Sequence, residues 1–473
     1  MWTRIMTAIG VASFSLTATT RALSQTALPD AAARRIDSIF SRFRVEGPGC
    51  ALGVFQSGSI AYERGYGSAN IEYGIPITPR TPFIMGSVSK QFTAAAIALL
   101  VERGRISLDD DVRKYVPELP DYGQRVTIDE LVHHTSGIRD FWALVDAAGM
   151  RFDDGYGVDD VVRLAARQRH LNFSPGTEYN YSNTGYVLLG VIVHRVTGLT
   201  LRQFAANEIF NPLGMVDSHY HDDHNEPVRG RAIAYTPMPA KLGAFRIDVW
   251  NNDIVGQGGV MTTVEDLQKW DENFYTGHVG GPTLLARQLT RGKLANGTML
   301  AYAFGLEVGE YRGLPTVDHS GSTGGYRTDI IRFPGERATV VTLCNTTTAD
   351  ASTLARRVAD VVLAARFTKP VPAQRVLAAQ QAAASVTIQD GELAALAGRY
   401  HSTELDADYD LAAGRNALIV RRPRGEIDTL QAIEADLFRT RAYSLRFVRQ
   451  AGHPSSFTLD NGRARGIEFE RMP

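Results

Sequence analysis

A serine and a lysine three residues apart are the strongest candidates for chemistry in this sequence. Ser87 and Lys90 fall at the start of an apolar stretch, residues 88–102, whose hydrophobic spacing predicts a helix. Positions i and i+3 share one helical face, so the Lys90 amine can reach the Ser87 hydroxyl. A lysine with a lowered pKa can take the proton that makes a serine nucleophilic. By itself, the same spacing also fits a serine that only caps a helix.

Tyr181 and Asn183 belong to a second candidate segment. They follow a Pro-Gly turn at residues 175–176 and precede an apolar run, residues 187–196, that predicts another helix. A phenol can act as a general acid or base where a nearby cation lowers its pKa. An asparagine amide offers both a donor and an acceptor to a substrate amide. The alternative is a loop that caps the helix.

The third candidate segment, residues 319–325, reads His-Ser-Gly-Ser-Thr-Gly-Gly and ends a predicted strand. A glycine at position 321 would let a substrate backbone approach closely. The backbone N–H of Ser322 could then stabilise an oxyanion, together with the free N–H groups of a helix start. The alternative is a Gly-rich turn between strands.

The order of the predicted elements shows how these segments can meet. A helix is predicted for residues 28–43, and a mainly helical region extends from 81 to about 280. Predicted strands precede and follow that region, at residues 51–56, 59–65, 316–319, 326–333 and 338–343, before a helix at 352–364. Strands from both ends are expected to form one sheet, with the helices as an inserted layer.

A change of composition separates a second domain. Residues 368–392 contain two prolines and an Ala/Gln-rich stretch, which predicts a partly helical linker. From residue 393, short segments alternate apolar and polar residues between glycine-containing turns. The clearest segments are 417–421, 444–448, 457–459 and 467–469. This spacing predicts an all-β sandwich or a small barrel.

The charge balance gives no electrostatic case for nucleic acid or a membrane surface as partner. Lys and Arg total 50, and Asp and Glu total 51. Phosphate-binding, His-Glu-x-x-His and Gly-x-Ser-x-Gly motifs are all absent from the sequence. Residues 219–224 contain three histidines, but their polar surroundings favour a solvated loop over a metal site. We therefore expect neither a cofactor nor a metal.

The first 24 residues have the pattern of an export signal. Arg4 gives a positive start, residues 5–16 are mostly apolar, and small residues follow. The apolar run is too short for a membrane-spanning helix, which needs about 20 residues. We expect export to a periplasm or to the cell exterior. A frayed N-terminal helix is the alternative.

Cys50 and Cys344 are the only cysteines. Each lies in a short apolar run that predicts a buried strand. Two buried free thiols are the favoured interpretation, and one disulfide is the alternative in an oxidising compartment.

Together, the three candidate segments resemble the motifs of the penicillin-recognising serine enzymes. This superfamily includes class C β-lactamases, D-Ala-D-Ala carboxypeptidases, D-amino-acid peptidases and related esterases. The order of the motifs matches, and so does their placement at a helix start, an interhelical loop and a strand end. Supporting segments at residues 131–138, 211–215 and 258–267 extend the resemblance over roughly residues 30–365.

The resemblance implies an α+β, β-lactamase/transpeptidase-like fold. A five-stranded antiparallel sheet would be flanked by helices, with the site between the sheet and an all-helical lobe. The first and last strands are neighbours in this fold, so Cys50 and Cys344 could lie close together.

The resemblance also implies roles for the motif residues. Ser87 is the expected nucleophile, and Lys90 and Tyr181 share proton transfer in acylation and deacylation. The backbone N–H groups of Ser87 and Ser322 form the oxyanion hole. The expected substrate-binding residues are Asn183, His319, Gly321 and Ser322.

His319 departs from the pattern of efficient β-lactamases, which usually carry a lysine there to help hold the drug's carboxylate. An imidazole is mostly neutral near pH 7, so it anchors a carboxylate less well. We expect a peptidase or esterase acting on small molecules or short peptides, such as D-amino-acid peptides or cell-wall fragments. A β-lactamase is the alternative enzyme. A penicillin- or muropeptide-binding sensor without turnover is the alternative from another class.

The C-terminal segment resembles the lipocalin-like β-barrel appended to some of these hydrolases, at residues 396–400, 436–438 and 466–469. The predicted organisation is a signal peptide (1–24), a β-lactamase-like domain (25–367), a linker (368–392) and this barrel (393–473). The barrel is expected to cover the active-site mouth, to mediate assembly into an oligomer, or to act as a passive stabilising module.

Overall fold

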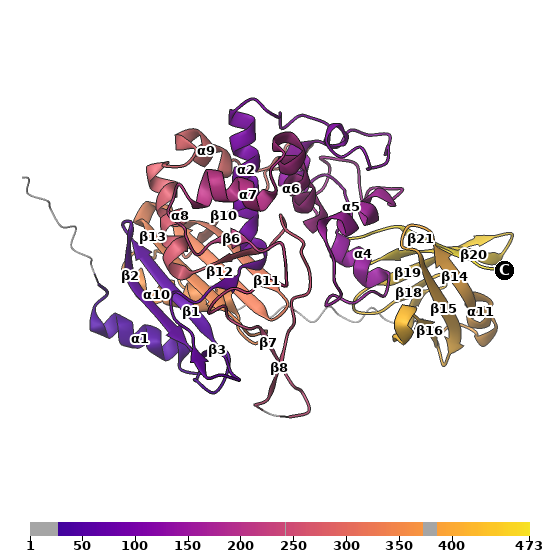
Figure 1. The fold of residues 1–473 in the computed structure, drawn as a ribbon. Helices are drawn as coiled ribbons and strands as arrows, with labels where there is room; N and C mark the ends of the chain where they lie inside the picture. The colour runs from indigo at the N-terminus through magenta and orange to yellow at the C-terminus, as the bar shows by residue number, and fades with distance from the viewer. Residues whose placement is uncertain (1–26, 242, 372–385) are drawn as a thin grey trace, which may run out of the picture.

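The computed structural model describes residues 27–241, 243–371 and 386–473 (Figure 1). The predicted signal peptide lies outside the described residues, as does the central part of the predicted linker.

A six-stranded antiparallel sheet forms the centre of the larger part of the molecule. In sheet order, the strands are β10 (Glu307–Tyr311), β11 (Leu314–Thr323), β12 (Tyr326–Phe333), β13 (Ala338–Cys344), β1 (Cys50–Gln56) and β2 (Ser59–Tyr66). Because β1 pairs with β13, the prediction that strands from both ends of the region share one sheet is confirmed. The implied five-stranded sheet lacked β10, an edge strand whose residues are mostly exposed and show no apolar alternation.

The sheet is covered on both faces. Helices α1 (Asp30–Phe40) and α10 (Ala351–Val362) bury one face, and α8 (Val264–Thr276) packs on the other. This layering is visible in Figure 1. Helix α9 (Gly281–Gln288) packs beside α2 (Lys90–Glu102).

The two cysteines lie directly opposite each other on neighbouring strands of the sheet. The register of β1 and β13 pairs Cys50 with Cys344, and their sulfur atoms form a disulfide. The interpretation as two free thiols is therefore wrong. Each apolar pattern showed that its thiol is buried, but a pattern within one strand says nothing about which residue lies opposite.

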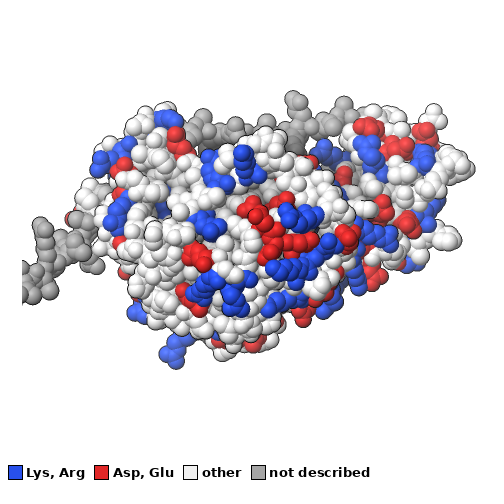
Figure 2. All heavy atoms as spheres, turned by 90° about the horizontal axis from the view of Figure 1, so that it is seen from above, with Lys and Arg blue, Asp and Glu red and all other residues white. Residues whose placement is uncertain are grey.

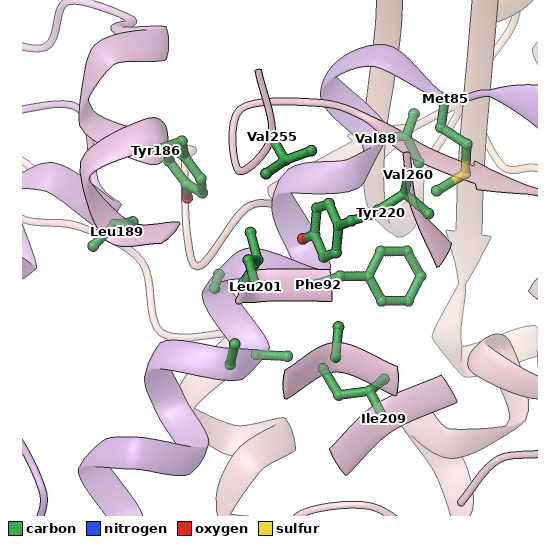
Figure 3. Packing of buried hydrophobic residues seen from close by; sticks show 14 of the residues in the cluster. Met85, Val88, Phe92, Tyr186, Leu189, Leu201, Ile209, Tyr220, Val255 and Val260 are labelled. Atoms are coloured by element: carbon green, nitrogen blue, oxygen red, sulfur yellow. The ribbon is translucent and has the colours of Figure 1, made fainter. Parts of the chain in front are cut away.

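A helical lobe joins the second face of the sheet. Its helices are α2, α3 (Ile128–Val132), α4 (Phe141–Ala147), α5 (Val158–Ala166), α6 (Asn183–Thr197) and α7 (Leu201–Ala205). Helix α2 is buried almost all round, and Val88 and Phe92 pack near Tyr220 and Val260 (Figure 3). No single helix among the described residues is both long and apolar enough to cross a membrane.

Residues 219–224 are only partly the solvated loop that their composition suggested. His219–Tyr220 forms the short strand β6, which pairs with β9 (Val260–Thr262), and Tyr220 and His221 are buried. His219 Nε2 lies 3.2 Å from His221 Nδ1. Pairing with β9 was not visible in the local sequence, so the loop prediction is wrong for these residues.

Short strands complete the larger part. Strands β3 (Ser68–Asn70) and β4 (Ile75–Pro76) pair, as do β7 (Tyr235–Pro237) and β8 (Phe245–Ile247), while β5 (Phe83–Ile84) joins β9.

The C-terminal part is a closed, antiparallel barrel of eight strands, which decides between the predicted sandwich and barrel. Its strands are β14 (Gly398–Ser402), β15 (Ala407–Gly414), β16 (Ala417–Arg421), β17 (Ile427–Glu434), β18 (Leu437–Arg439), β19 (Ser444–Gln450), β20 (His453–Asp460) and β21 (Ile467–Arg471). Helix α11 (Asp390–Leu396) precedes it. Tyr400, Tyr409, Phe457 and Phe469 fill its interior.

The barrel packs against the helical lobe beside α4 (Figure 1). A buried ion pair joins the two parts, with 2.9 Å between Arg139 Nη1 and Glu404 Oε1. On the face seen in Figure 2, basic and acidic side chains lie side by side, in keeping with the net charge of −1.

Candidate active site

Ser87 lies on a tight turn where the sheet meets the helical lobe. The turn, Gly86–Ser89, is a 3₁₀ turn that leads directly into α2. Gly86 has a φ of 54°, and a Cβ there would lie 2.9 Å from the backbone nitrogen of Ser322 on β11. A side chain at this position is excluded by both conformation and space. Glycine thus lets the Ser87 turn lie directly against the strand that carries the Ser322 N–H.

Lys90 is fully buried at the first residue of α2. Its Nζ lies 3.1 Å from Ser87 Oγ, 2.9 Å from Asn183 Oδ1 and 2.6 Å from the carbonyl oxygen of Gln257. Burial lowers the pKa of Lys90 well below its ordinary value, Asp140 partly opposes this shift, and Arg463 adds to it.

Lys90 Nζ donates to all three partners. The carbonyl oxygens of Asn183 and Gln257 can only accept, whereas the Ser87 hydroxyl can also donate. When the amine is uncharged, its two N–H bonds can stay on the carbonyl oxygens, and its lone pair can accept from Ser87. The sequence prediction that Lys90 reaches Ser87 is confirmed by the distance between them.

Asn183 is oriented by a carboxylate. Asp140 Oδ2 accepts from the backbone N–H of Asn183 at 2.6 Å and from its Nδ2 at 2.8 Å. The Asn183 amide therefore turns its oxygen toward Lys90, and one Nδ2 hydrogen remains for a substrate. Asp140 was not among the predicted site residues. It precedes α4 as an N-cap, and this local role is the only one that its sequence position suggests.

Tyr181 lies beside the lysine, as the motif predicted. Lys90 Nζ is 4.8 Å from the centre of the Tyr181 ring, and the rings of Tyr181 and His134 are 4.2 Å apart. Burial raises the pKa of Tyr181, and a hydrogen bond with Ser87 opposes the rise only in part. A neighbouring cation, Arg463, lowers this pKa as expected, but burial of Tyr181 outweighs its effect, so the pKa is raised overall. Tyr181 therefore holds its proton at neutral pH.

His319 is buried, and both of its ring nitrogens have protein partners. Nδ1 donates to the carbonyl oxygen of Ser320 at 2.6 Å, and Nε2 accepts from the hydroxyl of Tyr302 at 3.1 Å. Burial lowers the pKa of His319 to about 4, and the nearby Lys90 adds to the shift. His319 is thus a neutral group with both ring nitrogens engaged by the chain itself.

Gly321 and Ser322 lie beside the nucleophile turn. A Cβ on Gly321 would lie 2.0 Å from the carbonyl oxygen of Met85, so the chain's own backbone fills that space. Gly321 thus permits close packing of β11 on the segment before Ser87. Ser322 is exposed, and it borders a cavity of about 640 Å³ that Trp142, Asp248 and Trp250 also line.

Comparison with known proteins agrees with this geometry. The model of the family described as Beta-lactamase matches residues 36–363. The chain belongs to the Beta-lactamase family of serine hydrolases. Within this family, a D-aminopeptidase of Gluconobacter oxydans is 30% identical over 321 residues, which cover 67% of this chain and 60% of the relative. The match thus spans less than two thirds of that relative's length.

Solved structures show the same fold. An octameric penicillin-binding protein homologue from Pyrococcus abyssi superposes with a TM-score of 0.63 and 23% identity, covering 93% of this chain and 99% of that one. A D-amino acid amidase from Ochrobactrum anthropi has a TM-score of 0.60 and 21% identity, covering 71% of this chain and 99% of the other. The first match extends the likeness in fold beyond the Beta-lactamase family region.

Proposed function

We propose that the protein hydrolyses esters or amides through an acyl-enzyme formed on Ser87. The observation that carries this proposal is the partner set of buried Lys90: its Nζ lies within hydrogen-bond distance of two carbonyl oxygens and of the Ser87 hydroxyl. Because burial lowers the pKa of Lys90, that arrangement places a base within hydrogen-bond distance of Ser87.

Acylation starts when Ser87 Oγ attacks the substrate carbonyl carbon and passes its proton to Lys90. The backbone N–H groups of Ser87 and Ser322 stabilise the oxyanion. As the bond to the leaving group breaks, the phenol of Tyr181 gives its proton to the leaving nitrogen or oxygen. Lys90 then returns its proton to Tyr181, so both groups regain their starting states.

Deacylation runs with water in place of the leaving group. As the water oxygen attacks the acyl carbon, Tyr181 takes a proton from the water and passes its own phenol proton to Lys90. The Ser87–acyl bond breaks, and Ser87 Oγ regains a proton from Lys90. Product acid leaves, and the site is ready for another cycle.

The substrate class we propose is D-amino-acid amides, esters and short peptides. The names of a D-aminopeptidase relative and of a D-amino acid amidase with the same fold support this choice. A β-lactamase is disfavoured because His319 is neutral and already hydrogen-bonded on both nitrogens. A sensor without turnover is disfavoured because the Lys90 and Tyr181 set has the arrangement that deacylation needs.

The test is turnover of an activated D-alanine ester by the wild type and by Ser87→Ala. We expect Ser87→Ala to lose turnover while its thermal unfolding is unchanged. Retained turnover contradicts the nucleophile assignment. Fast cephalosporin hydrolysis by the wild type would support the β-lactamase instead, and an acyl-enzyme that never turns over would support the sensor.

We also propose that the protein is exported. The disulfide between Cys50 and Cys344 supports this location, because disulfides persist mainly in oxidising compartments. Cell fractionation of the producing organism, with N-terminal sequencing of the mature chain, tests it.

A further inference from the structure

The loop between β20 and β21 of the barrel reaches the active site. Its residues 461–466 lie against the helical lobe, where Asn180 Nδ2 donates to the carbonyl oxygen of Gly462 at 2.9 Å. The carbonyl oxygen of Arg463 accepts from Asn172 Nδ2 at 2.8 Å and from the backbone N–H of Asp140 at 3.1 Å. The loop is thus tied to the same residue, Asp140, that orients Asn183.

These bonds hold the backbone of Arg463 and leave its side chain exposed over the site. The guanidinium carbon lies 5.0 Å from the centre of the Tyr181 ring. Among the described residues, no carboxylate forms an ion pair with this guanidinium. Arg465, two residues on, is different, because its Nη1 pairs with Glu178 at 3.0 Å. Arg465 thus forms an ion pair within the protein, whereas Arg463 faces the site and has no ion-pair partner among the described residues.

A stacked guanidinium can still bind an anion. Contact with an aromatic face leaves the N–H groups at the edge of the guanidinium plane available, and their fork geometry matches a carboxylate. Burial lowers the pKa of both Lys90 and His319 and so disfavours their charged forms. Arg463 therefore supplies the permanent positive charge on the Tyr181 side of the site.

We infer that Arg463 recognises a carboxylate on the leaving group of the substrate, so that the barrel completes the substrate-binding site. The inference rests on the proposed function, in which Tyr181 protonates the leaving group. Because Arg463 lies over Tyr181, the part of the substrate nearest to it is that leaving group. A leaving group with a carboxylate is the C-terminal residue of a short peptide. The barrel thus favours removal of a C-terminal residue over cleavage of neutral amides.

Binding can be measured without turnover in the Ser87→Ala background. Isothermal titration calorimetry with N-acetyl-D-alanyl-D-alanine and with its C-terminal amide compares two ligands that differ only in the carboxylate. We expect the acid to bind tighter than the amide by on the order of 10-fold, as for a charged hydrogen-bonded contact. Adding Arg463→Ala removes this preference, and Arg463→Lys keeps part of it. Adding Arg465→Ala, the matched control on the same loop, leaves the preference intact.

Equal binding of the acid and the amide, no binding of the acid, or a preference that survives Arg463→Ala overturns the inference. Arg463 is then only a solvated cation. A failed Ser87-dependent ester assay contradicts the proposed function but leaves this binding comparison valid. The two failures are therefore distinguishable.

Discussion

Lys90 and His319 are two buried basic groups of the candidate site, and they differ in what their nitrogens contact. Burial lowers the pKa of both. Lys90 has two fixed acceptors and the Ser87 hydroxyl. His319 has the carbonyl oxygen of Ser320 and the hydroxyl of Tyr302, which use both ring nitrogens.

This difference shows that a lowered pKa alone does not make a buried basic group a catalytic base. A base also needs its lone pair to face the proton that it must take. Lys90 meets this condition, whereas the only lone pair of neutral His319 already accepts from Tyr302. The following substitutions should separate the two groups.

Lys90→Met should have the largest effect. We expect kcat for an activated D-alanine ester to fall on the order of 10³-fold, the range for loss of a positioned general base. Steady-state kinetics measure the loss. Lys293→Met, at an exposed lysine, is the control and should behave as wild type. Activity of Lys90→Met near the control would remove Lys90 from the mechanism.

The pH dependence of kcat/KM tests whether Lys90 is the base. Only the neutral amine can take the serine proton, so kcat/KM should rise with pH through the lowered pKa of Lys90 and then level off. Because the pKa of Tyr181 is raised, its phenol stays protonated across that plateau. A pH series of ester hydrolysis checks this. An activity that instead falls from acidic toward neutral pH contradicts a neutral lysine base.

Tyr181→Phe should have the next largest effect, and the size should depend on the leaving group. We expect a loss on the order of 10²-fold for an amide, whose nitrogen must be protonated as it leaves. A nitrophenolate leaves without being protonated, so the acylation rate of a nitrophenyl ester should fall less. Pre-steady-state acylation rates for the two substrates measure the difference. Equal losses would argue against Tyr181 as the proton donor to the leaving group.

Asp140→Asn should have a smaller effect, because Asp140 acts through Asn183. Asp140 uses Oδ2 for both N–H groups of Asn183 and Oδ1 for the backbone N–H of Ala143, whereas the substituted amide has only one acceptor oxygen for both tasks. We expect about a 10-fold drop in kcat from the misplaced amide, with the acid limb of the pH profile displaced because Asp140 also influences the pKa of Lys90. A loss of thermal stability with an unchanged pH profile would show a purely structural role.

His319→Gln should have the smallest effect on catalysis. A glutamine is neutral and can both donate and accept, so kcat should change by less than about threefold. The pH profile near neutrality should not move, since His319 already has a pKa of about 4. A large loss, or a shifted profile, would show that His319 takes part in proton transfer.

Much of the fold was predictable because its elements are long and strongly patterned. Helix α2 and the strands β12 and β13 follow directly from their apolar spacing. Strand β10 could not be predicted in this way, because it is an edge strand whose residues are mostly exposed and show no apolar alternation. The disulfide was not predicted either: free thiols were favoured, because the pairing depends on the register of β1 against β13, which neither strand shows alone.

The motif residues of the site could be predicted from the sequence, but the residues that orient and surround them could not. Ser87, Lys90, Tyr181 and Asn183 stand in recognisable short segments, and the structure brings them together. Asp140 and the Gln257 carbonyl group have no local pattern that distinguishes them from a helix cap and a loop backbone. Arg463 lies 282 residues beyond Tyr181 by sequence number, in a loop of the C-terminal barrel. Only the packing of the barrel on the helical lobe reveals their proximity.

Intact-protein mass spectrometry after rapid acid quench tests the central claim most directly. The wild type, Ser87→Ala and Ser320→Ala, an exposed serine on β11, are each mixed with an N-acyl-D-alanine nitrophenyl ester. The account predicts a transient increase equal to the acyl mass in the wild type and in Ser320→Ala, and no increase in Ser87→Ala. An acyl adduct on Ser87→Ala, or turnover by the wild type without any adduct under these conditions, would contradict an acyl-enzyme on Ser87.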